Sequence, residues 1–345
     1  MSDQVESLNE VELAAYLASH VESFAGPIKC SKFSGGQSNP TFKIEAESGN
    51  YVLRRQPPGK LLKSAHAVDR EFKVYQALAN SDVPVPKVFH LCEDRDVVGS
   101  MFYLMEFCDG RIFWDAALPE MDSNASRTQA YEQMNKVLAA IHSVDVDAAG
   151  LSDYGKPGNY FERQLNRWSG QYRASETQNI DAMNKLIAWL EENIPEDDGR
   201  VSLVHGDFRL DNMIFAPNKT EIISVLDWEL STLGHPFADL AYQCMQLRMP
   251  ANSGNMSGLA GCDRNALGIP TEKEYVAQYC QRMDISGIDN WAFYLAFSFF
   301  RLAAIAQGVA KRALEGNASN KQAMKVGAFV APLAMAALHV IKTES

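Results

Sequence analysis

The stretch LVHGDFRLDNMIF, residues 203–215, carries a histidine, two aspartates, an arginine and an asparagine within an otherwise apolar run. Buried strands rarely contain that many polar groups. Asp207 and Asn212 lie five positions apart, and Asp227 follows fifteen positions after Asn212, at the end of a second apolar run. Both runs have the pattern of short strands. We therefore expect these three oxygen-bearing side chains to converge on one point.

Such a group of oxygen ligands suits a hard divalent cation. Mg²⁺ prefers carboxylate and amide oxygens and commonly binds together with phosphate oxygens. Two metal-ligand candidates beside a third, free carboxylate favour phosphoryl transfer, in which one aspartate accepts the proton of the attacking hydroxyl. The alternative is that Asp207 caps a turn and Asn212 bonds its own backbone, as either residue often does alone.

The hydrophobic pattern changes along the chain. A first helix is expected over roughly residues 8–23, and residues 25–107 show strand-like runs with one helical segment between them. From about residue 111 helical spacing dominates. The sequence predicts an α+β protein with a small β-rich N-lobe over 1–107 and a larger, mainly helical C-lobe over 108–345, which holds a small β patch.

The first part also offers groups for holding a nucleotide. The glycine-rich stretch FSGGQSN can present backbone N–H groups to phosphates, although many such stretches are plain turns. Its candidate contacts are Gly35, Gly36, Ser38 and Asn39. Arg54 on the next strand and Glu71 on the following helix would provide a cation held by a carboxylate. Arg55 points to the opposite face of the strand, where we expect a solvated surface charge.

The motifs HGDFRLDN and VLDWE resemble those of the aminoglycoside phosphotransferase-like kinases, a small-molecule branch of the protein-kinase-like fold. The H-G-D-x-x-x-x-N spacing matches the kinase catalytic loop, and LDW stands where protein kinases carry D-F-G. FSGGQSNPTF, YVLRR, LMEFCDG and STLGHPFADLAY extend the resemblance over nearly the whole chain. More narrowly, YVLRRQPPGKLLKSAHAVDREF and FYLAFSFFRLAAIAQGVAKRA look like the kinase-like domains fused to acyl-CoA dehydrogenases. The resemblance implies a bilobal protein-kinase-like fold.

The resemblance also implies roles for individual residues, with ATP and Mg²⁺ as cofactors. Asp207 would be the catalytic base, and Asn212 and Asp227 the magnesium ligands. Arg54 would replace the usual nucleotide-phosphate lysine, with Glu71 as its partner. This replacement departs from the family pattern, because arginine is always charged and binds phosphate in a forked geometry.

Further roles implied by the resemblance concern the nucleotide base and the catalytic loop. Met105, Glu106 and Phe107 would form the hinge strand, whose backbone bonds the adenine edge. His205 would bond the catalytic-loop backbone in a structural role. Asp239 would brace the catalytic loop from the C-lobe.

The acceptor is expected to be a hydroxyl group on a small molecule. Arg163 and Arg167 lie one helical turn apart, and with Arg209 they could hold an anionic group of the acceptor, such as a carboxylate or a coenzyme A phosphate. The alternative is a surface pair that bonds nearby acids. The narrower resemblance and the arginines favour a hydroxyacyl acceptor, for example a coenzyme A thioester, whereas the family name suggests an aminoglycoside or amino alcohol.

Two rival functions remain open at this point. One is a catalytically silent module that binds nucleotide and regulates a partner. The intact set of Asp207, Asn212 and Asp227 argues against it. The other is a protein-substrate kinase, which the missing D-F-G and A-P-E motifs disfavour.

Composition excludes several classes of partner. The formal net charge of −11 disfavours binding to nucleic acid or to an anionic membrane surface.

Six scattered cysteines without a C-x-x-C pair fit a reducing cytoplasm. The acidic N-terminus lacks the basic start of a signal peptide. Arg301 interrupts the most apolar stretch, which therefore suggests a buried helix rather than a membrane span. We expect a cytoplasmic protein, and the sequence carries no signal of its oligomeric state.

Overall fold

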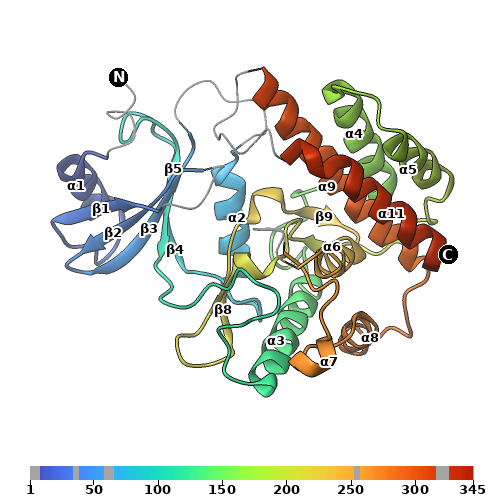
Figure 1. Cartoon of the computed structure of the whole chain (residues 1–345). Coiled ribbons are helices and arrows are strands. Elements are labelled where there is room, and N and C mark those ends of the chain that lie inside the picture. Colours follow the sequence, from blue (N-terminus) through green and yellow to red (C-terminus); the bar gives the residue numbers. More distant parts are fainter. Residues whose placement is uncertain (1–7, 34–38, 58–65, 252–256, 316–325, 345) are drawn as a thin grey trace. The chain divides into compact units, whose positions relative to one another are not determined.

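The computed structural model forms two compact units (Figure 1). It describes residues 8–33, 39–57, 66–251, 257–315 and 326–344. The first unit consists of residues 1–112, 149–151 and 212–231, and the second of residues 113–148, 152–211 and 232–345. A small antiparallel sheet in one unit and a larger set of helices in the other confirm the predicted α+β class.

The first unit is built on a five-stranded antiparallel sheet in the order β1-β2-β3-β5-β4. The strands are β1 (Ile28–Lys32), β2 (Thr41–Ala46), β3 (Gly49–Arg55), β4 (Val88–Cys92) and β5 (Phe102–Glu106). A tight turn after Ala46 joins β2 to β3, with Ala46 paired to Gly49. The crossover that places β5 beside β3 brings the hinge strand next to the strand of Arg54.

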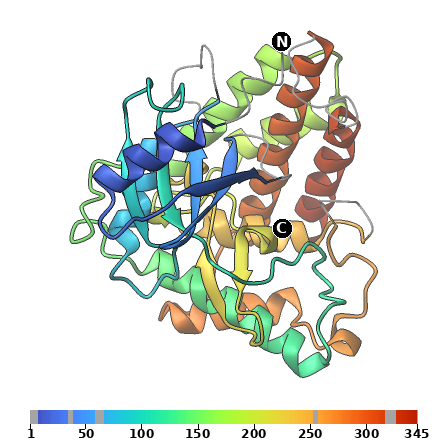
Figure 2. The ribbon, with the colours of Figure 1, turned by 90° about the vertical axis from the view of Figure 1, so that its left-hand side faces the viewer.

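Two helices belong to this unit, α1 (Glu10–His20) and α2 (Val68–Leu78). Figure 2 shows α1 lying across the strands. Leu13 and Leu17 of α1 are buried in one core with Leu104 of β5. Side chains alternate along a strand, so the neighbouring Tyr103 faces the other way, where its ring lies 6.0 Å from that of Tyr75 on α2. The sheet is therefore packed on both faces.

This double packing explains why the prediction for Arg55 was wrong. Arg54 lies on the α2 face, as its contacts below show, and Arg55 lies on the opposite face. Arg55 is only 4% exposed, its Nη1 donates to the Val98 carbonyl (2.9 Å), and its guanidinium lies over the Phe42 ring. The opposite face holds a core instead of solvent, so Arg55 is buried, while the Arg54 side chain keeps 11% exposure.

A short hairpin from later in the chain completes the first unit. It consists of β7 (Met213–Phe215) and β8 (Ile222–Val225). Arg111 and Phe215 exchange two backbone hydrogen bonds of 2.8 Å, and the Val225 N–H donates to the Pro84 carbonyl. These bonds group residues 212–231 with residues 1–112, whereas the sequence analysis assigned all of 108–345 to a second lobe.

The second unit is mainly helical. Its helices are α3 (Asn124–His142), α4 (Tyr160–Ser175), α5 (Asp181–Glu192), α6 (Phe237–Leu247), α7 (Arg264–Leu267), α8 (Glu272–Arg282), α9 (Trp291–Leu314) and α11 (Val330–Glu344). The strands β6 (Ser202–Val204) and β9 (Thr232–Gly234) pair in a short antiparallel ladder. Helix α9 packs against α4, α5, α6 and α11, which makes it the centre of this unit (Figure 1).

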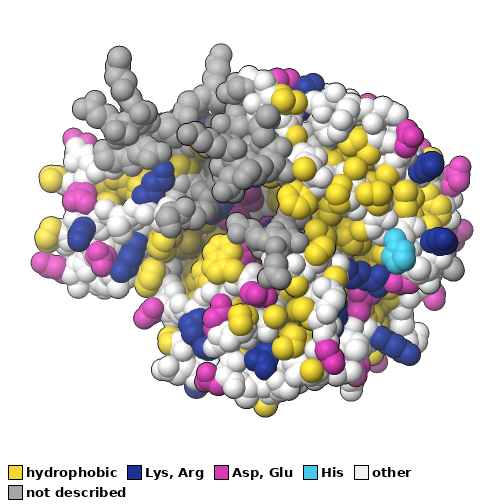
Figure 3. Space-filling model, in the orientation of Figure 1, with side chains coloured by type: hydrophobic (Ala, Val, Ile, Leu, Met, Phe, Trp, Pro, Cys, Tyr) yellow, Lys and Arg dark blue, Asp and Glu magenta, His cyan; other side chains and the backbone are white. Residues whose placement is uncertain are grey.

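Among the described residues, α9 is the one helix long and apolar enough to cross a membrane by length and composition. Its most apolar window is 83% buried inside the structure, which is typical of a core helix. On the face shown in Figure 3, hydrophobic side chains gather over α9 and α11, while acidic and basic side chains are interspersed.

Candidate active site

The loop between β6 and β7 carries Asp207, and a buried carboxylate holds its backbone. Asp239, in the first turn of α6, accepts the N–H groups of His205 (2.6 Å) and Gly206 (2.8 Å). Gly206 has φ of +83°, a conformation that residues with a side chain rarely adopt. The fully buried His205 accepts the Asp207 N–H at its Nδ1. The loop shape is thus set by buried hydrogen bonds and one glycine.

Asp239 is well suited to hold this loop as an anion. Burial opposes its ionisation, but hydrogen bonding and the charge of His142, together with His205 and the Gly206 N–H, outweigh burial and keep its pKa below the usual value. A carboxylate that accepts several N–H groups is strongly favoured over the neutral acid.

The Asp207 carboxylate lies at the accessible end of this loop. Its side chain is 24% exposed, and its Oδ1 accepts the hydroxyl of Tyr242 on α6 (2.8 Å). Arg209 Nε lies 4.0 Å from the same oxygen. A carboxylate that is both reachable and fixed in orientation has the properties required of a general base.

Asn212 and Asp227 lie at the same end of the β7–β8 hairpin. The Leu226 N–H donates to the Asn212 carbonyl (2.8 Å), which brings the two segments side by side. Asp227 has φ of +65° and a side chain that is 32% exposed. Of the three oxygen-bearing residues, the structure thus brings these two together within the first unit. Asp207 belongs to the other unit, five residues earlier in the chain.

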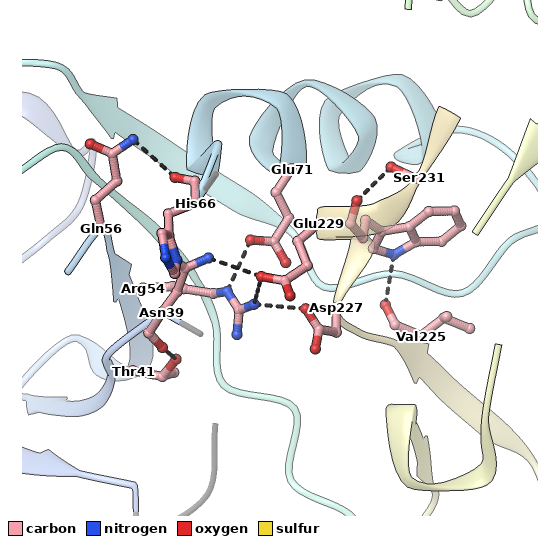
Figure 4. Close-up of polar contacts among 11 residues, drawn as sticks. Asn39, Thr41, Arg54, Gln56, His66, Glu71, Val225, Asp227, Glu229 and Ser231 are labelled. Carbon is pink, nitrogen blue, oxygen red and sulfur yellow. Dashed lines mark hydrogen bonds and ion pairs between the residues drawn. The ribbon is translucent and has the colours of Figure 1, made fainter. Parts of the chain in front are cut away.

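Arg54 lies at the centre of a cluster of three carboxylates (Figure 4). Its Nε donates to Glu71 (2.9 Å), its Nη2 donates to Asp227 (2.7 Å), and Glu229 lies 3.6 Å from the same nitrogen. We call these four residues the Arg54 cluster. Burial opposes the charge of Arg54, but Glu71 and Asp227 outweigh burial and raise the pKa of the guanidinium well above its usual value.

The Arg54 cluster has an excess of negative charge. One guanidinium faces three carboxylates, and Glu71 Oε1 is buried without a hydrogen-bond partner among the described residues. Burial raises the pKa of Glu71 to about 7; Arg54 opposes this shift, while Asp227 and Glu229 add to it. A bound dication would offset this excess charge.

The oxygen ligands of this region fit Mg²⁺ only together with other ligands. Within the described part of the chain, no group of three His, Cys, Asp or Glu side chains could hold a metal ion alone. Mg²⁺ usually takes one or two protein ligands and completes its shell with phosphates and water. The adjacent, partly exposed Asp227 and the Asn212 amide fit that mode of binding.

A test of the Arg54 cluster follows from the raised pKa of Glu71. Folded Glu71 holds its proton more tightly than the unfolded chain does, so its contribution to stability is complete below about pH 4.5 and is lost as the pH rises through about 7. This loss amounts to roughly 3 kcal/mol in the free energy of unfolding. Glu71→Gln should lack this decline. Urea unfolding of both proteins at pH 5, 6, 7 and 8 measures it, and parallel declines would contradict the assignment.

The predicted phosphate loop is only partly described. Gly35, Gly36 and Ser38 lie outside the described residues. Asn39 is buried, its Nδ2 donates to Glu229 (3.3 Å), and its Oδ1 lies 3.1 Å from His66 Nδ1. The Asn39 side chain therefore connects the end of this loop to the Arg54 cluster, as Figure 4 shows.

The predicted hinge residues lie at the end of β5. Met105 is buried and Glu106 is exposed. The Glu106 N–H donates to the Lys87 carbonyl (2.8 Å) and the Phe107 N–H to the Asn50 carbonyl (3.4 Å). Because these two N–H groups are already paired, adenine recognition here would use other backbone groups of the segment.

The three arginines expected to hold an anionic acceptor have different surroundings. Arg209 donates through two nitrogens to Asp211. Arg163 Nη1 donates to the Pro157 carbonyl (3.3 Å), and Arg167 lies over the Trp168 ring. Burial opposes the charge of Arg209, yet Asp211 and Asp207 outweigh it and raise its pKa well above the usual value. Arg209 is thus half of an ion pair.

A pocket lies beside the Asp207 loop, within the second unit. Arg209 and Tyr242, which both approach Asp207, form part of its wall. Its lining is mostly apolar: Trp114, Ala116, Tyr131, Met134, Arg209, Leu210, Asp211, Tyr242, Gln243, Gln246, Leu247, Met249, Ser257 and Leu302. Trp114 is 58% exposed. The pocket offers an apolar surface with a few polar groups, as small-molecule sites commonly do.

The sequence analysis did not identify Glu229 or Tyr242 as site residues. Glu229 lies two positions after Asp227 in the quoted motif VLDWE, and Tyr242 lies three positions after Asp239 in FADLAY. Both were therefore within motifs already singled out. What was missing is the tertiary contact, because Glu229 meets Arg54 175 positions away and Tyr242 meets Asp207 35 positions away.

Comparison with known proteins identifies the family of the chain. Residues 29–264 match the model of the phosphotransferase enzyme family. The chain is 51% identical over 309 residues to acyl-CoA dehydrogenase family member 10 of Mus musculus and 42% identical over 333 residues to family member 11 of Rattus norvegicus. These alignments cover 90% and 95% of this chain but only 29% and 42% of the relatives. The chain thus spans less than half of their length.

Solved structures give a similar result. A Ralstonia eutropha JMP134 protein, provisionally assigned as an aminoglycoside phosphotransferase, is 48% identical with a TM-score of 0.88, covering 97% of this chain and 99% of that one. The complex of a mutant aminoglycoside phosphotransferase APH(4)-Ia with ADP and hygromycin B is 14% identical with a TM-score of 0.62, covering 94% and 97%. The second likeness concerns the fold alone. Together they confirm the protein-kinase-like fold.

Proposed function

Because the chain belongs to the phosphotransferase enzyme family, we propose that it transfers the γ-phosphoryl group of ATP to a hydroxyl group of a small molecule, with Mg²⁺ as cofactor. The observation that carries the proposal is the Asp207 carboxylate, accessible on a loop held by Asp239 and oriented by Tyr242.

Asp207 is assigned to proton transfer. Its carboxylate accepts the proton of the acceptor hydroxyl while the acceptor oxygen bonds to the γ-phosphorus and the bond to the β–γ bridging oxygen breaks, which releases ADP. Asn212 and Asp227 are the residues that would hold Mg²⁺. When bound, the ion neutralises charge on the phosphates.

The Arg54 cluster is assigned to the nucleotide phosphates. Arg54 donates to Asp227 Oδ1 in this structure, and the second carboxylate oxygen of Asp227 would be available to Mg²⁺. Glu71 keeps the guanidinium in place through the separate bond to Nε. Gly35, Gly36 and Ser38 are proposed to bind phosphate through their N–H groups. Adenine is proposed to lie against residues 105–107.

A hydroxyacyl compound is the acceptor class that the pocket supports best. The walls are mostly apolar, and Arg209 is balanced by Asp211, which suits an acyl chain better than a polycationic sugar. Arg163 and Arg167 remain proposed contacts for an anionic group such as a coenzyme A phosphate.

The six cysteines are free thiols, which supports a cytoplasmic location.

The proposal is tested by measuring ATP consumption and product mass for a panel of hydroxyacyl-CoA thioesters, aminoglycosides and amino alcohols. We expect Mg²⁺-dependent consumption with hydroxyacyl thioesters and a phosphorylated product of matching amount. Preference for an aminoglycoside would contradict the acceptor class. If ATP is not consumed with any of the three classes of acceptor, the proposed reaction itself is contradicted.

A further inference from the structure

Tyr242 connects the Asp207 carboxylate to the core of the second unit. It lies on α6 and is 5% exposed, and its hydroxyl donates to Asp207 Oδ1 (2.8 Å). Its ring packs under the guanidinium of Arg301, whose Cζ lies 5.5 Å from the ring centroid. A carboxylate that would otherwise rotate about its last bond is thus attached to a rigid aromatic side chain.

Arg301 is the charged residue in the middle of the apolar helix α9. It is 7% exposed, its Nη2 donates to the Gly206 carbonyl (2.7 Å), and its guanidinium also lies over the Trp168 ring (5.7 Å). Within the described residues, no salt bridge to a carboxylate involves Arg301. Burying a cation without such a partner is unfavourable, and an apolar side chain often gives a more stable core.

Both backbone polar groups of Gly206 are therefore held. Asp239, on α6, accepts the Gly206 N–H, and Arg301, on α9, donates to the Gly206 carbonyl. Asp207 follows directly, and Tyr242 fixes its carboxylate. Proton transfer requires the base within a few tenths of an ångström of its productive position. The buried cation therefore has a geometric role that an apolar residue could not fill.

We infer that Tyr242 and Arg301 are positioning residues that hold Asp207 in its reactive orientation, Tyr242 through the carboxylate and Arg301 through the Gly206 carbonyl and the Tyr242 ring. The inference rests on the proposed role of Asp207 as the base. We therefore expect variants of these two residues to lower kcat and to change the KM values for ATP and acceptor little.

The first test is Tyr242→Phe, which removes one hydroxyl and keeps the ring. Because hydrogen bonds to charged groups are among the stronger ones, kcat should fall about tenfold, with both KM values within about twofold of wild type. Tyr51→Phe is the matched control, since it removes a hydroxyl bond to Ser48 in the other unit, and it should keep kcat. Unchanged kcat in Tyr242→Phe, or a rise in KM alone, would contradict the inference.

The second test separates positioning by Arg301 from general packing. Arg301→Met should lower kcat about tenfold or more without lowering Tm. Arg301→Lys should have a higher kcat than Arg301→Met, because lysine keeps the positive charge. Gln307→Met is the control on the same helix, because Gln307 is also buried but donates to the Ser175 carbonyl. This variant should lower Tm and keep kcat. A loss of kcat in proportion to Tm across all three variants would show that Arg301 acts through stability alone.

A double-mutant comparison distinguishes failure of this inference from failure of the proposed function. If Tyr242 acts through Asp207, adding Tyr242→Phe to Asp207→Asn lowers the residual kcat no further. A second tenfold loss would contradict positioning. If Asp207→Asn alone keeps full activity, the proposed base is wrong. If Asp207→Asn loses activity while Tyr242→Phe is fully active, the proposed base stands and only the positioning role is contradicted.

Discussion

Asp207→Asn is expected to lower kcat by a factor of about 10²–10⁴, the usual contribution of a general base. Asparagine has the same shape and can still accept the Tyr242 hydroxyl, but it cannot take the proton of the acceptor. The KM for ATP should stay within about twofold of wild type, because Asp207 is not among the proposed nucleotide contacts. Steady-state kinetics with the best acceptor of the panel measures both constants.

The control for this variant is Asp145→Asn, which changes an exposed carboxylate in a turn of the same unit and should leave kcat unchanged. Circular dichroism and Tm verify that both variants are folded. Activity of Asp207→Asn within about threefold of wild type would mean that another group accepts the proton.

Arg54→Met is expected to lower the free energy of unfolding by about 3–5 kcal/mol, the usual effect of removing one partner of a buried ion pair. Glu71, whose side chain is 1% exposed, would lose its cation while Asp227 and Glu229 remain close by. The loss should be larger at pH 8 than at pH 6, because protonation relieves the repulsion among the carboxylates. Urea unfolding measures it.

Two further variants identify the cause of this loss. Arg55→Met removes the neighbouring buried guanidinium, which lies on the other face of β3, and should not show the same dependence on pH. Arg54→Met combined with Glu71→Met removes the orphaned charge and should recover part of the stability. If the double variant is less stable than Arg54→Met, the uncompensated carboxylate is not the cause.

Local patterns predicted the elements of the first unit well. The one helical segment expected within residues 25–107 is α2, and both limits of α1 lie within three residues of the expected 8–23. The chain order of the strands was also readable, since each strand has its own apolar run. The position of β5 between β3 and β4 could not be predicted from the sequence, because strand pairing depends on contacts between distant segments.

The same limit applies to the site. Asp207, Asn212 and Asp227 stood out because apolar, strand-like runs rarely contain or adjoin so many polar groups. Tyr242 and Glu229 looked like ordinary members of a helix and a turn until the fold brought them to Asp207 and Arg54. Arg301 was noticed only as a charge that interrupts an apolar helix, and its contact with Gly206 gives that charge a role.

The most direct test of the proposed function is transfer of a labelled γ-phosphate. The full chain is incubated with Mg²⁺, γ-labelled ATP and hydroxyacyl-CoA thioesters, and the products are separated. We predict that the label appears on the acceptor with the wild-type protein, that it appears there at least about a hundredfold more slowly with Asp207→Asn, and that it does not appear without Mg²⁺. Label that stays in ATP, or that is released only as inorganic phosphate whatever acceptor is present, would contradict the proposed transfer.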